Sequence, residues 1–268
     1  MKFLAAAVQM LASDDKKANL AEAERWTRKA VEQGARVVAL PEVFIWRGEH
    51  KREREFAEPV PGPTFEAMAR LAGELGIHLL AGSILEEIPD SHKAYNTSLL
   101  FGPSGELMAS YRKMHLFDVD LANGVSARES ATREFGDAVA VANTDICAMG
   151  LTVCYDLRFP ELYRALAHQD ARIIFVPSAF TAYTGAAHWE TLLRARAIEN
   201  QVYVIAPDQF GKSAKSFATH GHSMIVDPWG KILAELPDGP GVIVAEIDLD
   251  YLARVRGELP ALKHRRLA

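Results

Sequence analysis

Cys154 stands where an apolar run ends and a helix is predicted to begin, in the segment MGLTVCYDLRFPE that spans residues 149–161. A strand that ends in a tight turn before a helix presents the side chain of the turn at the carboxyl edge of a sheet, where open α/β folds place their chemistry. Backbone N–H groups at the start of the helix would favour a thiolate and a developing oxyanion. The alternative is that Cys154 is a small, inert side chain in the core, as most free cysteines are.

Three further ionisable residues could act together with Cys154. Glu42 follows a fully apolar predicted strand, so its poorly solvated carboxylate could act as a general base. Lys113 ends the second strand of a predicted hairpin, where its ammonium could neutralise an oxyanion, and Glu129 adds a second carboxylate from a long irregular stretch. Taken singly, the glutamates could be solvated loop residues and Lys113 an edge-strand residue that prevents aggregation. Taken together, the four form the set that acyl transfer through a thioester requires.

Histidine is the commoner base for a cysteine nucleophile, and the chain has nine histidines. Those in suggestive positions are His115, His188, His220 and His222, so a Cys–His pair stays open as an alternative. Motifs for metal ions (HxxxH, CxxC), for phosphates (GxxxxGK[ST]) and for dinucleotides (GxGxxG) do not occur in the sequence. We therefore expect neither a metal ion nor a cofactor.

The composition is that of an ordinary globular protein, and we expect a single domain over residues 1–268. The net charge of −5 and the pI of about 6.0 do not indicate a basic surface of the kind that binds nucleic acid. No apolar run reaches the roughly 18 residues of a membrane span, so no membrane partner is expected. The two cysteines, Cys147 and Cys154, lie too close together along one extended stretch to pair, which favours a reducing, cytoplasmic location.

The first residues pose a choice between a signal peptide and a strand. Residues 3–12 are mostly apolar and follow Lys2, as in a short signal peptide. Gln9 interrupts the run, however, and no clean cleavage site of small residues follows it. We predict a first β-strand that ends before residues 13–16.

Apolar periodicity predicts strands that alternate with helices, interrupted by two hairpins. Mixed sheets covered by helices are the expected result. Three irregular stretches are also expected, and stretches longer than about 12 residues in a compact domain are more often functional than accidental. The expected elements are helices at 19–33, 64–75, from about 160, 188–201 and 249–258; strands at 36–40, 77–85, 172–177, 202–207 and 242–247; hairpins at 95–112 and 222–236; and irregular stretches at 46–63, 117–136 and 208–221.

Four short motifs, in this order, resemble those of the nitrilase superfamily of carbon–nitrogen hydrolases: LPE at 40–42, YRKMHL at 111–116, RES at 128–130 and CYDLRFPE at 154–161. The resemblance covers essentially the whole chain. It implies an α/β fold, a four-layer α-β-β-α sandwich of two mixed sheets flanked by helices, which usually pairs across a two-fold axis, so that a homodimer or higher homo-oligomer is expected. It also implies Glu42 as general base, Lys113 as oxyanion stabiliser with the backbone N–H of Tyr155, Cys154 as nucleophile and Glu129 as supporting carboxylate, without cofactor or metal.

Within the superfamily the chain is most similar to the branch that includes ω-amidase and deaminated-glutathione amidase, and the segments at 128–130 and 259–266 favour the latter. Substrates of this branch carry an α-keto carboxylate, for which Arg158 is the first candidate cation. Arg158 could instead form an internal salt bridge with Glu161 or Asp156. Arg128 is a second candidate, and Thr181 and Tyr183 could line the pocket.

The expected substrate is therefore a small, carboxylate-bearing amide, and the expected activity is that of a deaminated-glutathione amidase. An ω-amidase that acts on 2-oxoglutaramate or 2-oxosuccinamate is the main alternative. A nitrilase or an N-carbamoyl amine hydrolase is a further one. The complete set of Glu, Lys, Glu and Cys argues against an inactive member that serves as a binding protein.

Overall fold

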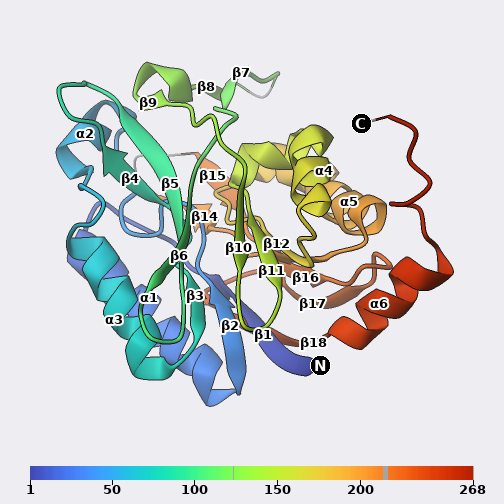
Figure 1. The fold of residues 1–268 in the computed structure, drawn as a ribbon. Helices are drawn as coiled ribbons and strands as arrows, with labels where there is room; N and C mark the ends of the chain where they lie inside the picture. Colours follow the sequence, from blue (N-terminus) through green and yellow to red (C-terminus); the bar gives the residue numbers. More distant parts are fainter. Residues whose placement is uncertain (123, 214–216, 268) are drawn as a thin grey trace.

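The computed structural model describes residues 1–122, 124–213 and 217–267, which form four layers of secondary structure. Figure 1 shows α1 and α3 on the outer side of one sheet and α4 and α5 on the outer side of the other, with the two sheets face to face between them. The predicted four-layer sandwich is thereby confirmed. The helices are α1 (Lys16–Glu32), α2 (Glu53–Phe56), α3 (Pro63–Leu75), α4 (Pro160–His168), α5 (Ala182–Asn200) and α6 (Leu249–Glu258), with short 3₁₀ segments at His50–Arg52, Glu129–Ala131 and Cys154–Arg158.

Both sheets are mixed, as the alternation of hairpins and crossovers predicted. In the first, the order is β18 (Gly241–Asp248), β1 (Lys2–Gln9), β2 (Ala35–Ala39), β3 (His78–Leu80), β5 (Ala94–Phe101), β4 (Ile84–Glu87), and β6 (Leu107–Arg112) and β9 (Arg133–Glu134) also pair with β5. In the second, the order is β10 (Ala140–Asn143), β11 (Ala148–Leu151), β12 (Ile173–Phe175), β13 (Tyr203–Ala206), β16 (Ser223–Val226), β17 (Ile232–Leu236). Two ribbons stand apart, β7 (Asp118–Asp120) with β8 (Ser126–Arg128) and β14 (Phe210–Lys212) with β15 (Ala218–His220).

The first strand shows why the layers form. Side chains of β1 alternate between faces: Ala5 and Ala7 pack in the core shared with the second sheet, while Ala6 and Val8 pack in the core beneath α1 and α3. Because β1 pairs with β2 on one side and β18 on the other, it is an interior strand. The prediction of a strand at the N-terminus is confirmed.

The predicted elements differ from the structure most in three places. Helix α1 begins three residues earlier than expected, where the Asp15 side chain caps it. Helix α5 begins at Ala182 rather than near residue 188, because the Thr181 hydroxyl caps a first turn that contains Thr184 and Gly185, which are poor helix formers. The expected strand at 77–85 is broken into β3 and β4 at Gly82, where φ is +38° and a β-carbon would lie 1.9 Å from the carbonyl oxygen of Pro41.

This break has a consequence for the chemistry. It brings the chain after Gly82 against the segment that follows β2, and the Ser83 hydroxyl accepts a hydrogen bond from the N–H of Val43 at 3.0 Å. The backbone on both sides of Glu42 is therefore held in place.

Over the described parts of the chain, no helix has the length and apolar character needed to cross a membrane.

Candidate active site

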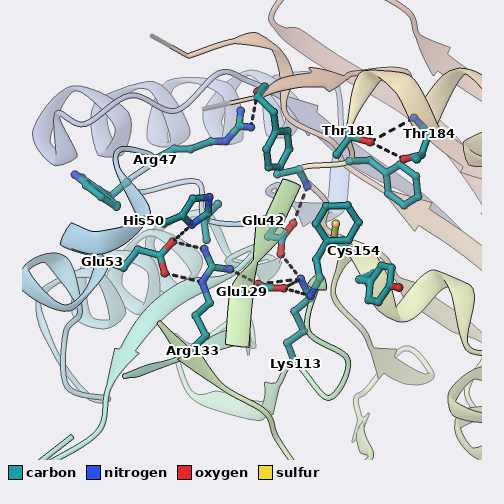
Figure 2. A pocket seen from close by; sticks show the side chains of 18 of the residues that line it. Glu42, Arg47, His50, Glu53, Lys113, Glu129, Arg133, Cys154, Thr181 and Thr184 are labelled. Carbon is teal, nitrogen blue, oxygen red and sulfur yellow. Dashed lines mark hydrogen bonds and ion pairs between the residues drawn. The ribbon is translucent and has the colours of Figure 1, made fainter. Parts of the chain in front are cut away.

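Four side chains from different elements meet in one cavity, and they are the four predicted to be catalytic. Glu42, Lys113, Glu129 and Cys154 all line one cavity that is partly open to solvent. Figure 2 shows Glu42 and Lys113 pointing toward one another beside Cys154, with Glu129 on the other side of the ammonium. The cavity lies where β2, β6 and β11 end, so the four side chains meet near strand ends, and their catalytic roles stay a prediction.

Cys154 sits at a sharp turn between β11 and a 3₁₀ segment. Its backbone is left-handed, with a φ of +50°, which residues other than glycine rarely adopt. The N–H of Cys154 donates to the carbonyl of Pro177 at 3.0 Å, which ties the turn to the chain after β12. Since Tyr155 is the second residue of the 3₁₀ segment, its N–H has no acceptor within that segment and is available beside the sulfur.

Glu42 is held in a single orientation. Its Oε1 accepts hydrogen bonds from the Asn96 amide at 2.8 Å and the Lys113 ammonium at 3.0 Å. Its Oε2 accepts from the N–H of Ala179 at 2.8 Å. The side chain is only 3% exposed, so its contacts with the protein replace those with water. A carboxylate fixed in this way next to a thiol has the geometry of a general base.

Lys113 is shared between the two carboxylates. Its Nζ lies 3.0 Å from Glu42 and 2.9 Å from Glu129, and its side chain is 2% exposed. Burial alone would lower the pKa of Lys113, but the negative charges of Glu129 and Glu42 raise it above its usual value. The residue is therefore a permanent cation, suited to stabilising an oxyanion and unsuited to proton transfer.

The thiol of Cys154 is not activated by the helix start in the resting protein. Burial raises the pKa of Cys154 well above its usual value, and the negative charge of Glu42 raises it further, although Lys113 acts in the opposite direction. A backbone N–H, that of Ala179, does act to lower the pKa of Cys154, but its effect is smaller than the effects of burial and of Glu42. The proton has to be removed by a base at the moment of attack, and the Glu42 carboxylate lies beside the sulfur in the same cavity.

A chain of buried charges continues behind Glu129. Arg133 forms ion pairs with Glu129 and, at 2.7 Å, with Glu53, and His50 lies 2.8 Å from the same Glu53 carboxylate. Burial alone would raise the pKa of Glu53, but the charge of Arg133 holds it well below its usual range. Sequence reasoning missed these three residues, which lie in the irregular stretches 46–63 and 117–136.

Asp156 holds the nucleophile turn together from beneath. It is fully buried, and its carboxylate accepts from the Tyr111 hydroxyl at 2.7 Å, the Val153 N–H at 2.8 Å, and the His115 N–H at 3.1 Å, with the His115 ring 2.7 Å away. The turn is therefore joined to the end of β6, which also positions Lys113. Sequence analysis weighed Asp156 only as a partner of Arg158, and the structure pairs it with His115 instead.

We expect Asp156→Ala to lower the free energy of unfolding by about 3 kcal/mol, because it leaves several buried donors without an acceptor. Urea denaturation measures this difference directly. Asp238→Ala, at an exposed turn residue, is the matched control and should change the stability by less than about 0.5 kcal/mol. Equal stabilities of the two variants would contradict the role assigned to Asp156.

The structure brings only some of the predicted substrate-binding residues to the cavity. Tyr155, Arg158 and Thr181 line it, and Thr181 also caps α5. Arg128 does not: its exposed guanidinium pairs with Asp120 and with carbonyls of β7 and β8, and the cavity is lined by its two neighbours, Ala127 and Glu129, instead. Tyr183 is 53% exposed in the first turn of α5 and does not line the cavity either.

None of the four histidines considered as partners of Cys154 lines this cavity. His115 faces Asp156 and stacks on Phe159, and His188 lies 3.1 Å from Arg158. His220 and His222 stack on each other in a second cavity beside α5. A Cys–His pair is therefore absent from the described residues.

Among the residues that the structure describes, no group of three or more potential ligands is placed to hold a metal ion.

Comparisons with known proteins agree with this geometry. A family model described as carbon-nitrogen hydrolase matches residues 4–257. The chain is 46% identical over 266 residues to a deaminated glutathione amidase of Synechocystis sp., with 98% of each chain covered. It is 42% identical over 265 residues to an omega-amidase of Xenopus tropicalis, covering 99% of this chain and 95% of that one. The crystal structure of a Saccharomyces cerevisiae member of branch 10 of the nitrilase superfamily matches with a TM-score of 0.90 at 35% identity, over 99% of this chain and 97% of that one.

Proposed function

The chain belongs to the carbon–nitrogen hydrolase family and is an enzyme that hydrolyses amides, and we propose that its substrate is a small amide bearing a carboxylate, of the type of deaminated glutathione. The observation that supports this proposal is the meeting of Cys154, Glu42 and Lys113 in one cavity that also contains the Arg158 guanidinium. The similarity to a deaminated glutathione amidase over 98% of both chains favours this substrate type.

The proposed reaction proceeds through a thioester. Glu42 takes the proton of the Cys154 thiol as the sulfur attacks the amide carbon, which becomes tetrahedral. The developing oxyanion is stabilised by the Lys113 ammonium and the N–H of Tyr155. As the C–N bond breaks, Glu42 returns the proton to the leaving nitrogen, and the amine or ammonia departs.

Water completes the cycle. Glu42 removes a proton from a water molecule that attacks the thioester carbonyl, and the same two donors stabilise the second oxyanion. The carbon–sulfur bond then breaks, the thiolate recovers its proton from Glu42, and the acid is released. Lys113 keeps its proton throughout, which agrees with its raised pKa.

Glu129 acts in this scheme as a positioning residue. Both of its oxygens accept from the Lys113 ammonium, at 2.9 and 3.1 Å, and one also accepts from the N–H of Phe117 at 2.6 Å. The ion pair with Arg133 fixes the carboxylate from behind. Glu129 therefore determines where the ammonium of Lys113 points, without itself exchanging protons.

The function is tested by a panel of three substrates: deaminated glutathione, 2-oxoglutaramate and a simple aliphatic nitrile. We expect release of cysteinylglycine from the first, slower release of ammonia from the second and no product from the third. Preference for 2-oxoglutaramate would instead indicate an ω-amidase, and the similarity to the omega-amidase of Xenopus tropicalis supports this alternative. Absence of turnover with both amides would refute the proposal.

Arg158 is proposed to bind the α-keto carboxylate on the acyl side of the scissile amide. Its guanidinium lies against the rings of Phe180 and Tyr155, at 5.1 and 5.7 Å, and forms no ion pair with a carboxylate of the described residues. We expect Arg158→Gln to raise KM for either amide about 10- to 100-fold, the value of one charge-assisted contact. Arg128→Gln removes an exposed arginine outside the cavity and should leave KM unchanged; equal effects of the two substitutions would contradict the assignment.

We also propose that the enzyme is a cytoplasmic homodimer or higher homo-oligomer, without nucleic-acid or membrane partners. Ile198 and Trp229 are large apolar side chains that are 48% and 58% exposed, on α5 and on the turn between β16 and β17. Exposed apolar side chains of this size support a contact with a second copy. Both cysteines are free, as a reducing compartment would require.

A further inference from the structure

We propose that Arg47 binds the carboxylate carried by the leaving amine of the substrate, while Arg158 binds the carboxylate on the acyl side. This inference rests on the proposed function, in which a substrate of the type of deaminated glutathione has both groups. It assigns the residue that binds the second of them.

Arg47 is a buried cation in the wall of the catalytic cavity. It follows β2 by eight residues, its side chain is only 6% exposed, and it lines the same space as Cys154. Its Nη2 donates to the carbonyl of Phe217 at 3.0 Å, its Nη1 lies 3.4 Å from the Thr219 hydroxyl, and the ring of Phe217 stands 5.1 Å from the guanidinium carbon. These contacts hold the guanidinium without neutralising it (Figure 2).

The other cations of the cavity wall have counter-charges. Lys113 pairs with Glu42 and Glu129, and Arg133 pairs with Glu53 and Glu129. Within the described ranges, Arg47 and Arg158 are the two arginines of this wall that form no ion pair with a carboxylate. The cavity thus contains two uncompensated guanidinium groups, one more than an amide with a single carboxylate would use.

The two protein carboxyl groups that influence Arg47 electrostatically do not supply the missing charge, and one of them, Glu42, is already paired with Lys113. Asp208 influences Arg47 electrostatically, but it forms no ion pair with it in the described structure, and burial raises the pKa of Asp208 well above its usual range, which favours its neutral form. Burial lowers the pKa of Arg47 to about 10, so the group is still a cation at neutral pH. A buried cation without a counter-charge is costly, and a substrate carboxylate would offset this cost through two parallel hydrogen bonds.

The two free arginines approach the nucleophile from different elements. Arg47 belongs to the segment after β2, whereas Arg158 ends the 3₁₀ segment that Cys154 begins. Both are close enough to the sulfur that a negative charge on Cys154 raises the pKa of each. An amide whose carbonyl carbon lies at the sulfur can therefore direct one anionic group toward each guanidinium.

The experiment compares Arg47→Gln with the wild type on two substrates that differ in one charge: deaminated glutathione, and its analogue with a carboxamide in place of the terminal glycine carboxylate. For the wild type, we expect kcat/KM to be at least tenfold higher for the two-carboxylate amide, mainly through KM. In Arg47→Gln this preference should fall to about one. Because the ratio is taken on one enzyme preparation, it does not depend on the fraction of protein that is folded. Arg128→Gln, which alters an exposed arginine, should keep the wild-type ratio.

Two outcomes would overturn the inference: a wild-type enzyme that does not distinguish the two amides, or an Arg47→Gln variant that loses the same factor on both. If the wild type hydrolyses neither amide, the proposed function fails, and the inference is then decided by binding. Calorimetry on Cys154→Ala should show deaminated glutathione binding at least tenfold more tightly than its carboxamide analogue, with the difference abolished by adding Arg47→Gln. Equal affinities would overturn the second carboxylate site independently of turnover.

Discussion

Replacing Cys154 with alanine is expected to reduce kcat for amide hydrolysis by at least about 10⁴-fold, since the covalent route disappears and only binding and the oxyanion donors remain. Serine at this position should be almost as inactive, because its hydroxyl is far less acidic than the thiol and Glu42 is a weak base for it. The rate of amine or ammonia release under substrate saturation measures the loss. A residual rate above about one hundredth of the wild type would contradict a thioester mechanism.

Cys154→Ala and Cys154→Ser are both expected to be about as stable as the wild type. Alanine and serine retain a β-carbon in the left-handed backbone of residue 154, so the conformational strain of the turn is the same in all three proteins. Their melting temperatures should agree within a few degrees. Acid quenching during turnover, followed by mass spectrometry of the intact chain, should show an acyl adduct on the wild type alone, which separates a missing nucleophile from a damaged cavity.

The second large effect is expected from Lys113→Met. Removing the ammonium takes away the charge that faces the oxyanion, which should lower kcat by about 10²- to 10³-fold. It also leaves Glu42 and Glu129 buried without their shared cation, and breaking such a buried pair should lower the free energy of unfolding by about 3–5 kcal/mol. Activity and urea stability should therefore fall together.

Lys93→Met is the control for this substitution. Lys93 forms a half-exposed ion pair with Glu134 at 3.2 Å, outside the cavity, so the same chemical change should affect stability by less than about 1 kcal/mol and leave kcat intact. A Lys113→Met enzyme with normal kcat and raised KM would show that the lysine binds the ground state of the substrate. The assignment to the oxyanion would then be wrong.

Sequence reasoning located the residues that follow regular strands. Glu42, Lys113 and Cys154 each come within three residues of the end of a strand whose apolar pattern is clear. The strands before Glu42 and Lys113 belong to one sheet and the strand before Cys154 to the other, so the packing of the two sheets brings these strand ends together. Glu129 had no such support, and only the resemblance to a family assigned it a role. The irregular stretch around Glu129 has no apolar periodicity, so the pattern of apolar residues did not indicate where its side chain lies.

The residues that were missed depend on contacts between distant segments. Glu53 and Arg133 are separated by 80 positions, and each lies in a stretch without apolar periodicity. Arg47 lies in the first of these stretches, so no pattern distinguished it from a surface arginine. Its burial arises from the turn of the chain over the cavity, which local sequence does not encode.

Arg128 and Arg133 illustrate this limit most clearly. Both flank Glu129, and sequence analysis selected Arg128 because it is part of the family motif. A short 3₁₀ segment, Glu129–Ala131, lies between them, and Arg128 pairs with the exposed Asp120 while Arg133 pairs with the buried Glu129 and Glu53. Because this stretch has no apolar periodicity, the sequence did not show which of the two arginines is buried.

The left-handed backbone at position 154 places stability and activity in conflict. A side chain in that conformation costs roughly 1–2 kcal/mol, much of which glycine would recover. Glycine has no nucleophilic atom, however, so the residue that would relax this turn is one that the proposed reaction cannot use. Part of the folding free energy is therefore given up to keep sulfur in the cavity.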